Sequence, residues 1–129
     1  MGQALDERVV LFVDEQYILQ STADRLNRKG VKTHFLDPTI DYTASTQDLK
    51  LKAVVYEPYF AFSDQSDHFR PILNEILERA DRNGAIIIAL TSQDEEALNA
   101  EGFLKGRHYD HFLQKPILAL ANELAKYLT

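Results

Sequence analysis

Short apolar runs alternate with longer amphipathic stretches along the chain, which is the pattern of repeated βα units around a parallel sheet. Strands are expected at residues 8–13, 32–36, 53–57, 85–90 and 110–114. The first and fourth of these runs, RVVLFV and AIIIAL, are almost continuously apolar. Strands of that composition are buried on both faces, so the sheet is expected to lie between two layers of helices.

Helical periodicity is strongest after the third expected strand. Apolar side chains recur every three or four residues over 69–80, and an Asn-Gly pair at 83–84 follows as a stop. The other expected helices cover residues 15–29, 45–51, a short stretch from about 93, and 116–128. Gly30 is the predicted stop of the first helix. Ser92 and Glu95 have the spacing of a capping box at the start of the short one.

A chain of 129 residues suits one domain, which is expected to span residues 1–129 with its core at about 8–128. Right-handed crossovers between the strands give a doubly wound, three-layer α/β sandwich. In open sheets of this kind the binding site lies outside the carboxyl ends of the strands. The polar residues at those ends are Asp14, Glu15, Asp37, Glu57, Thr91, Ser92 and Lys115.

Four of the strand ends carry short motifs, which are VDE, VVYEP, IALTS and FLQKP in chain order. The series resembles the receiver domains of response regulators over roughly residues 8–128. That family places an acidic pair after the first strand and a phosphorylated Asp after the third. It places Thr or Ser after the fourth strand and Lys-Pro after the fifth. The resemblance implies a five-stranded parallel sheet in the order 2-1-3-4-5, with about five helices.

Glu57 stands where the receiver family has its phosphorylated Asp. The resemblance implies that Asp14, Glu15 and Glu57 share an acidic pocket, which in the family holds Mg²⁺. A Glu in place of Asp moves the carboxylate by about 1.5 Å, enough to misalign it with a metal and a phosphorus atom. Pro58 also follows Glu57 directly, whereas the family's proline comes several residues later. Ordinary phosphorylation is therefore not expected; no cofactor is predicted, and Mg²⁺ stays open.

The remaining positions of the receiver pattern are retained. Lys115 corresponds to the lysine that pairs with phosphoryl oxygens, and Pro116 is expected to follow it through a cis peptide bond. Thr91 and Phe112 correspond to the pair of switch residues. The longer side chain of Glu57 is expected to reach the Lys115 ammonium. It would then fix a negative charge near Thr91 and partly imitate a phosphoryl group.

Composition narrows the classes of function. The formal net charge of −6 leaves no excess of Lys and Arg to neutralise nucleic acid or an anionic membrane surface. The absence of Cys excludes disulfides, thiolate metal sites and cysteine nucleophiles. No apolar signal core or run of about 20 apolar residues is present, so a cytoplasmic location is expected. His108, Asp110 and His111 have weak metal-ligand spacing and are expected to form a solvated loop.

The predicted function is that of a pseudo-receiver, a signal-transduction module that works by protein association and is not an enzyme. Its partner would be a histidine kinase, an output protein, or a second copy bound through the fourth helix, fifth strand and fifth helix. The alternative is a working receiver that binds Mg²⁺ and takes part in a phosphorelay. A small flavodoxin-like cofactor protein is a third class. It is disfavoured because DEQYILQST, after the first strand, has no Gly to cradle a phosphate.

Overall fold

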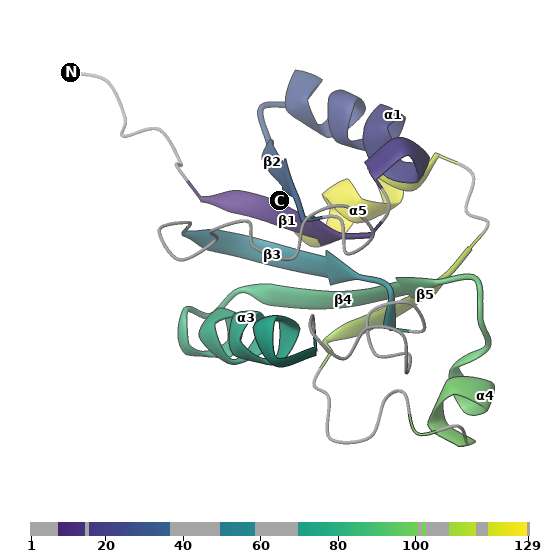
Figure 1. Ribbon diagram of the computed structural model, residues 1–129. Helices are drawn as coiled ribbons and strands as arrows, with labels where there is room; N and C mark the ends of the chain where they lie inside the picture. The colour runs from purple at the N-terminus through teal and green to yellow at the C-terminus, as the bar shows by residue number, and fades with distance from the viewer. Residues whose placement is uncertain are drawn as a thin grey trace.

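The computed structural model describes residues 8–14, 16–36, 50–58, 70–100, 102, 109–115 and 119–128. Five parallel strands form one sheet in the order β2-β1-β3-β4-β5 (Figure 1). The strands are β1 (Val9–Val13), β2 (Lys32–Phe35), β3 (Leu51–Tyr56), β4 (Ile86–Thr91) and β5 (His111–Gln114). The α/β class and the strand order expected from the sequence are therefore confirmed.

Four helices belong to the described residues, and not about five as expected. They are α1 (Gln16–Arg28), α3 (Arg70–Arg82), α4 (Glu95–Ala100) and α5 (Leu120–Leu128). Of the short helix expected at 45–51, residues 45–49 lie outside the described residues. Its last residue, Leu51, is the first residue of β3, so the prediction is wrong at that position. None of the helices in the described ranges is long and apolar enough to span a bilayer.

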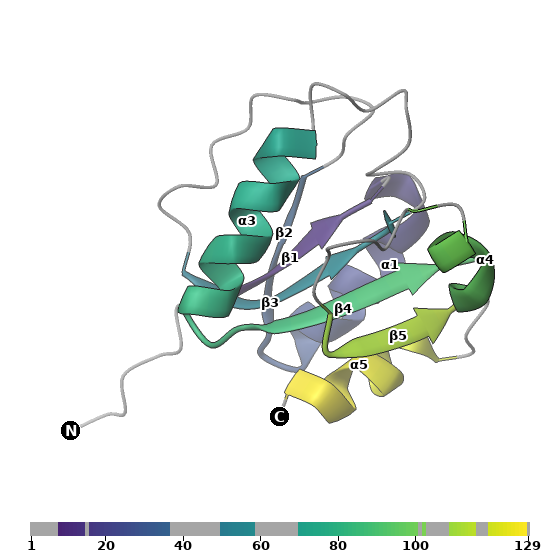
Figure 2. The same cartoon turned by 90° about the horizontal axis from the view of Figure 1, so that it is seen from below.

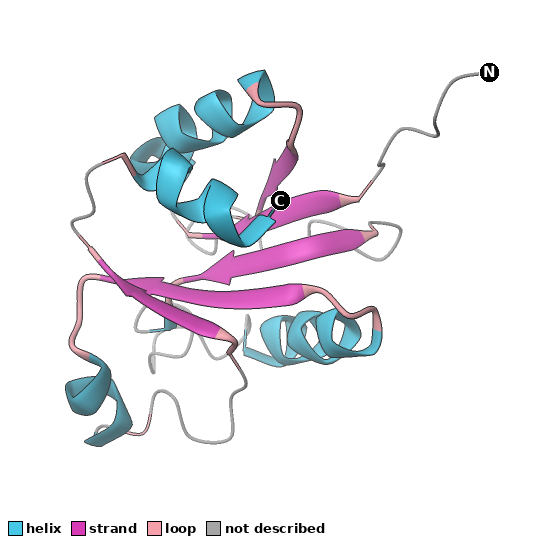
Figure 3. Cartoon of the chain, turned by 180° about the vertical axis from the view of Figure 1, so that it is seen from behind, coloured by secondary structure: helices cyan, strands magenta, loops and turns pink. Residues whose placement is uncertain are grey.

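Helices cover both faces of the sheet (Figures 2 and 3). Successive side chains of a strand point to opposite faces, and β1 follows this rule. Leu11 belongs to the core that Leu73 of α3 completes, whereas Val10 belongs to the core that Leu124 of α5 completes. α1 lies beside α5 on the second face, and its buried Leu19 joins the same core. The expected burial of the sheet between two helical layers is confirmed.

The helices α1 and α3 end in the same Schellman motif. Gly30 and Gly84 have φ angles of 87° and 70°, in the left-handed region that glycine adopts without a steric penalty. The amide after each glycine donates to a carbonyl of the last helical turn, in the pairs Val31–Leu26 and Ala85–Ala80. Both predicted stops are confirmed, and a strand, β2 or β4, follows directly after each motif.

The cap of α4 differs from the one expected. Asp94 immediately precedes the helix, and its Oδ1 accepts a hydrogen bond from the backbone N–H of Glu96 at 2.7 Å. Ser92 lies two residues further back and is exposed. The predicted capping box of Ser92 and Glu95 is therefore wrong. A carboxylate one position before the helix satisfies a free amide of its first turn, which Ser92 was expected to do.

The last helix is shorter than expected. α5 begins at Leu120, because Ala119 has a φ of 54° and a helix from 116 cannot continue through that backbone conformation. Residues 116–118 lie outside the described residues. The predicted apolar face of the remaining part is confirmed, since Ala121, Leu124 and Leu128 are buried.

Candidate functional site at the carboxyl ends of the strands

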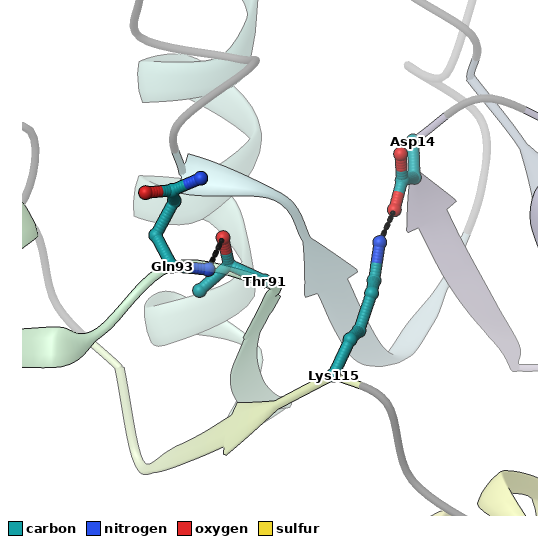
Figure 4. A network of polar contacts seen from close by, with 4 residues as sticks. All are labelled: Asp14, Thr91, Gln93 and Lys115. Carbon is teal, nitrogen blue, oxygen red and sulfur yellow. Dashed lines mark hydrogen bonds and ion pairs between the residues drawn. The ribbon is translucent and has the colours of Figure 1, made fainter.

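An ion pair joins the ends of β1 and β5. Asp14 comes directly after β1 and Lys115 directly after β5. The Lys115 Nζ donates a hydrogen bond to the Asp14 Oδ2 at 2.9 Å (Figure 4). Because β3 and β4 separate these two strands, the lysine side chain reaches across the carboxyl ends of both. The side chains are 20% and 5% exposed, so the pair is largely withdrawn from water.

Thr91 holds the backbone of Lys115 in place. It is the last residue of β4 and is fully buried. Its carbonyl oxygen accepts a hydrogen bond of 2.6 Å from the Lys115 amide, which continues the β4–β5 pairing beyond the end of β5. Its Oγ1 accepts a second hydrogen bond, from the Gln93 amide at 3.1 Å (Figure 4). Thr91 therefore fixes both the backbone of Lys115 and the turn that leads to α4.

Glu57 lies beside Asp14 at the same edge of the sheet. Its amide donates to the Val13 carbonyl oxygen at 3.1 Å, and Val13 is paired with Tyr56. Asp14 and Glu57 thus follow paired positions of adjacent strands, whose backbones run about 4.8 Å apart. Glu57 is only 7% exposed and Asp14 only 4%. Two buried acidic residues thus end neighbouring strands, and the Lys115 ammonium pairs with the first of them, in surroundings where charged groups depend on partners.

The sequence places these residues at one edge but predicts the wrong partner for the lysine. Glu57 was expected to meet the Lys115 ammonium, whereas the structure directs that ammonium to Asp14. The physical reason is that Asp14 and Glu57 stand at the same level of neighbouring strands. Spacing along the chain cannot decide which of two such carboxylates a cation meets.

The described part of the site is a poor fit for Mg²⁺. Lys115 already supplies a positive charge to Asp14, the first of the expected metal ligands. Among the described residues, no group of three His, Cys, Asp or Glu side chains is arranged to hold a metal ion. Glu15 and Pro116 lie outside the described residues, so the full set of Asp14, Glu15 and Glu57 and the expected cis peptide bond stay predictions.

A second polar contact joins α4 to the segment before β5. The Tyr109 hydroxyl donates a hydrogen bond to the Glu95 carboxylate. This bond, followed by burial and the charge of Glu95, raises the pKa of Tyr109 from 10.0 to about 12. The Tyr109 ring also lies against Phe112 of β5, with ring centroids 5.9 Å apart and planes tilted by 60°. Phe112, the expected switch residue, is half-buried and packs against the core on the α3 side.

The contact between Tyr109 and Glu95 is not predicted by the sequence. Tyr109 lies within GRHYDH, where the two histidines have metal-ligand chemistry and the tyrosine has none. The available signal was the aromatic pair Tyr109 and Phe112, which are three residues apart. Nothing local identifies Glu95 as the partner, because 14 residues separate it from Tyr109.

Two of the candidate metal ligands, Asp110 before β5 and His111 at its start, make structural contacts. Asp110 extends the β4–β5 pairing: its amide donates to the Ile87 carbonyl oxygen at 2.7 Å, and its Oδ2 accepts from the Ile87 amide at 2.8 Å. The His111 ring lies against the Tyr127 ring of α5, with centroids 4.0 Å apart. His108 lies outside the described residues. Asp110 and His111 therefore join β5 to its neighbours.

Comparisons of the chain with protein-family models, with curated proteins and with solved structures give no match. The resemblance to receiver domains consequently depends on the four strand-end motifs and on the arrangement of the residues they contain.

Proposed function

We propose that the chain is a receiver-like signalling module that works by protein association and is not phosphorylated in the ordinary way. The strand order 2-1-3-4-5 supports a receiver-like or flavodoxin-like arrangement. The residues at the strand ends favour the receiver. The observation that carries the proposal is the Lys115–Asp14 ion pair beside the buried Glu57.

The charges of the site support a permanently fixed state. In a working receiver the lysine pairs with an incoming phosphoryl group, but here its ammonium is already paired with Asp14. Withdrawing it would leave a buried carboxylate without its cation, which is strongly unfavourable. Glu57 supplies a second negative charge at the position of the acceptor, and it is buried. The site thus carries, without any modification, negative charge of the kind that phosphorylation introduces in a working receiver.

Phosphorylation by a small donor tests this proposal. The protein is incubated with acetyl phosphate and Mg²⁺, and its intact mass is measured. We expect the unmodified mass for the natural sequence. Glu57→Asp restores the acceptor type of the family and should take up more phosphoryl groups, while Glu57→Gln controls for modification elsewhere. One phosphoryl group per molecule on the natural sequence, absent from Glu57→Gln, would refute the proposal.

That result would instead support the second candidate, a working receiver in a phosphorelay. The observation in its favour is the gathering of Asp14, Thr91 and Lys115 with a carboxylate at position 57. These groups are of the types that the family uses around its acceptor. The two candidates differ in whether Glu57 accepts a phosphoryl group, so the same mass measurement separates them.

The proposal also covers the binding surface and the kind of partner. Association is assigned to the surface of α4, β5 and α5, and the partner to a signalling protein or a second copy of this chain. Sedimentation velocity over a range of concentrations tests the second copy directly. A single species of monomer mass at every concentration would leave a different protein as the partner.

A further inference from the structure

The helix α4 is attached differently from the other helices. Figures 1 and 2 show it at the carboxyl edge of the sheet, away from the faces that α1, α3 and α5 cover. It has six residues, and Leu98 is its one buried side chain. A helix of this length is not stable by itself in water. Contacts outside the helix must therefore keep it in place.

Two polar contacts provide this attachment. Asp94 caps the first turn and orders the helix locally. Tyr109 makes the long-range contact, since its hydroxyl donates to Glu95 in that same turn. A hydrogen bond to a charged acceptor is among the stronger ones in proteins. Tyr109 is itself held by its packing against Phe112 and the core on the α3 side, so the bond ties α4 to an ordered part of the molecule.

We propose that the Tyr109–Glu95 hydrogen bond is a latch that holds α4 at the edge of the sheet, and that opening it changes the surface formed by α4 and β5. The inference rests on the proposed function, in which that surface binds the partner. It adds the device that controls the surface. When the latch opens, α4 keeps its cap and its buried Leu98 but loses its hydrogen bond to the segment before β5. The Tyr109 ring keeps its packing against Phe112 and the core, so the change falls on α4.

The latch connects with the candidate site through a short stretch of chain. Thr91 accepts a hydrogen bond from the Gln93 amide, and the cap residue Asp94 comes next. A change in the position of Thr91 is thereby transmitted to the first turn of α4. Glu95, the acceptor of the latch, is the first residue of that turn. Thr91 thus bonds Gln93, two residues before the latch acceptor Glu95, and its carbonyl oxygen bonds the Lys115 amide of the candidate site.

Hydrogen–deuterium exchange of the full chain tests the latch. Tyr109→Phe removes the hydroxyl and keeps the ring, and Glu95→Gln removes the charge of the acceptor. The matched controls are Tyr127→Phe, which removes a hydroxyl from α5, and Glu96→Gln, which removes a charge from the same turn of α4. We expect exchange over residues 95–100 to accelerate about tenfold in Tyr109→Phe, somewhat less in Glu95→Gln, and in neither control.

The exchange rates over residues 95–100 either support the latch or overturn it. Unchanged exchange over 95–100 in both latch variants would overturn the proposal. Equal acceleration in the control variants would overturn it too, because the effect would then be general. If Tyr109→Phe is destabilised throughout, as circular dichroism would reveal, Glu95→Gln alone decides. None of these results depends on phosphoryl transfer, so failure of the latch and failure of the proposed function are seen in different measurements.

Discussion

The helices α3 and α4 follow consecutive strands of the same sheet, yet they are held by different kinds of contact. α3 lies along one face and buries four side chains, Leu73, Ile76, Leu77 and Ala80. α4 stands at the carboxyl edge, buries one side chain, and depends on a cap and a hydrogen bond. The first arrangement uses apolar area, and the second uses a few directed contacts.

The two regions also differ in how strongly their contacts depend on charge. Apolar burial is insensitive to small changes of charge, so the α3 face is a stable platform. The ion pair and Glu57 lie at the carboxyl edge, and the latch joins α4 at that edge to Tyr109, which precedes β5. All three involve ionisable side chains. Regions that move are drawn from the less stable parts of a protein. The edge is thus expected to open at a lower free energy than the α3 face.

The largest expected effect is on the α3 face. Leu73→Ala leaves a cavity under α3 and should lower the free energy of unfolding by about 3–4 kcal/mol. Urea denaturation followed by circular dichroism measures the change. Asn74→Ala is the matched control, because Asn74 is exposed on the same helix and should change the stability little. A loss below about 1 kcal/mol for Leu73→Ala would mean that α3 is not held by burial.

Removing the lysine of the edge should be somewhat less costly. Lys115→Met leaves the Asp14 carboxylate buried without its cation, and we expect a loss of about 3 kcal/mol. The double variant Asp14→Asn, Lys115→Met removes both charges and should recover part of this loss. Equal losses in the single and double variants would show that the uncompensated Asp14 charge is not the source of the loss. Urea denaturation of both variants separates these cases.

Most of the framework follows from features that act locally in the sequence. Three kinds of local feature each predict one element. They are the apolar runs RVVLFV and AIIIAL, the helical periodicity over residues 69–80, and the helix stops at Gly30 and Gly84. All of them are confirmed. These elements follow from patterns of a few residues, which is why the sequence is sufficient for them. The strand order, which the resemblance to receiver domains implied, is confirmed as well, and it brings Asp14, Glu57, Thr91 and Lys115 to one edge.

The contacts between elements were harder to predict. The partner of Lys115 was wrong because Asp14 and Glu57 end neighbouring strands at the same level. The Tyr109–Glu95 bond was missed because its residues approach only after β4 and β5 have paired. The cap of α4 was placed at Ser92 because the capping-box spacing fits, although Asp94 offers an acceptor closer to the helix. In all three cases several polar groups compete, and three-dimensional position decides.

The corrected cap offers a smaller and sharper test of how α4 is attached. Asp94→Ala removes the side chain that accepts from the Glu96 amide, and we expect a loss of about 1 kcal/mol. Ser92→Ala should change the stability by less than about 0.5 kcal/mol, because Ser92 is exposed and is not the cap. Chemical denaturation of the pair measures both. A larger loss for Ser92→Ala than for Asp94→Ala would restore the cap first expected from the sequence.

The smallest expected effect concerns the titration of Tyr109. Its hydrogen bond to Glu95 raises its pKa to about 12 from 10.0, so the bond stabilises the fold fully below about pH 10. That stabilisation is lost as the pH rises through about 12, where the hydroxyl ionises. Glu95→Gln should lower the pKa of Tyr109 toward its ordinary value, as measured from the ¹³C NMR shift of the Tyr109 Cζ. Glu96→Gln, which removes a charge one residue away, should lower it much less. Equal lowering in both variants would attribute the raised pKa to the general negative charge of α4 and not to the direct bond that distinguishes this helix from α3.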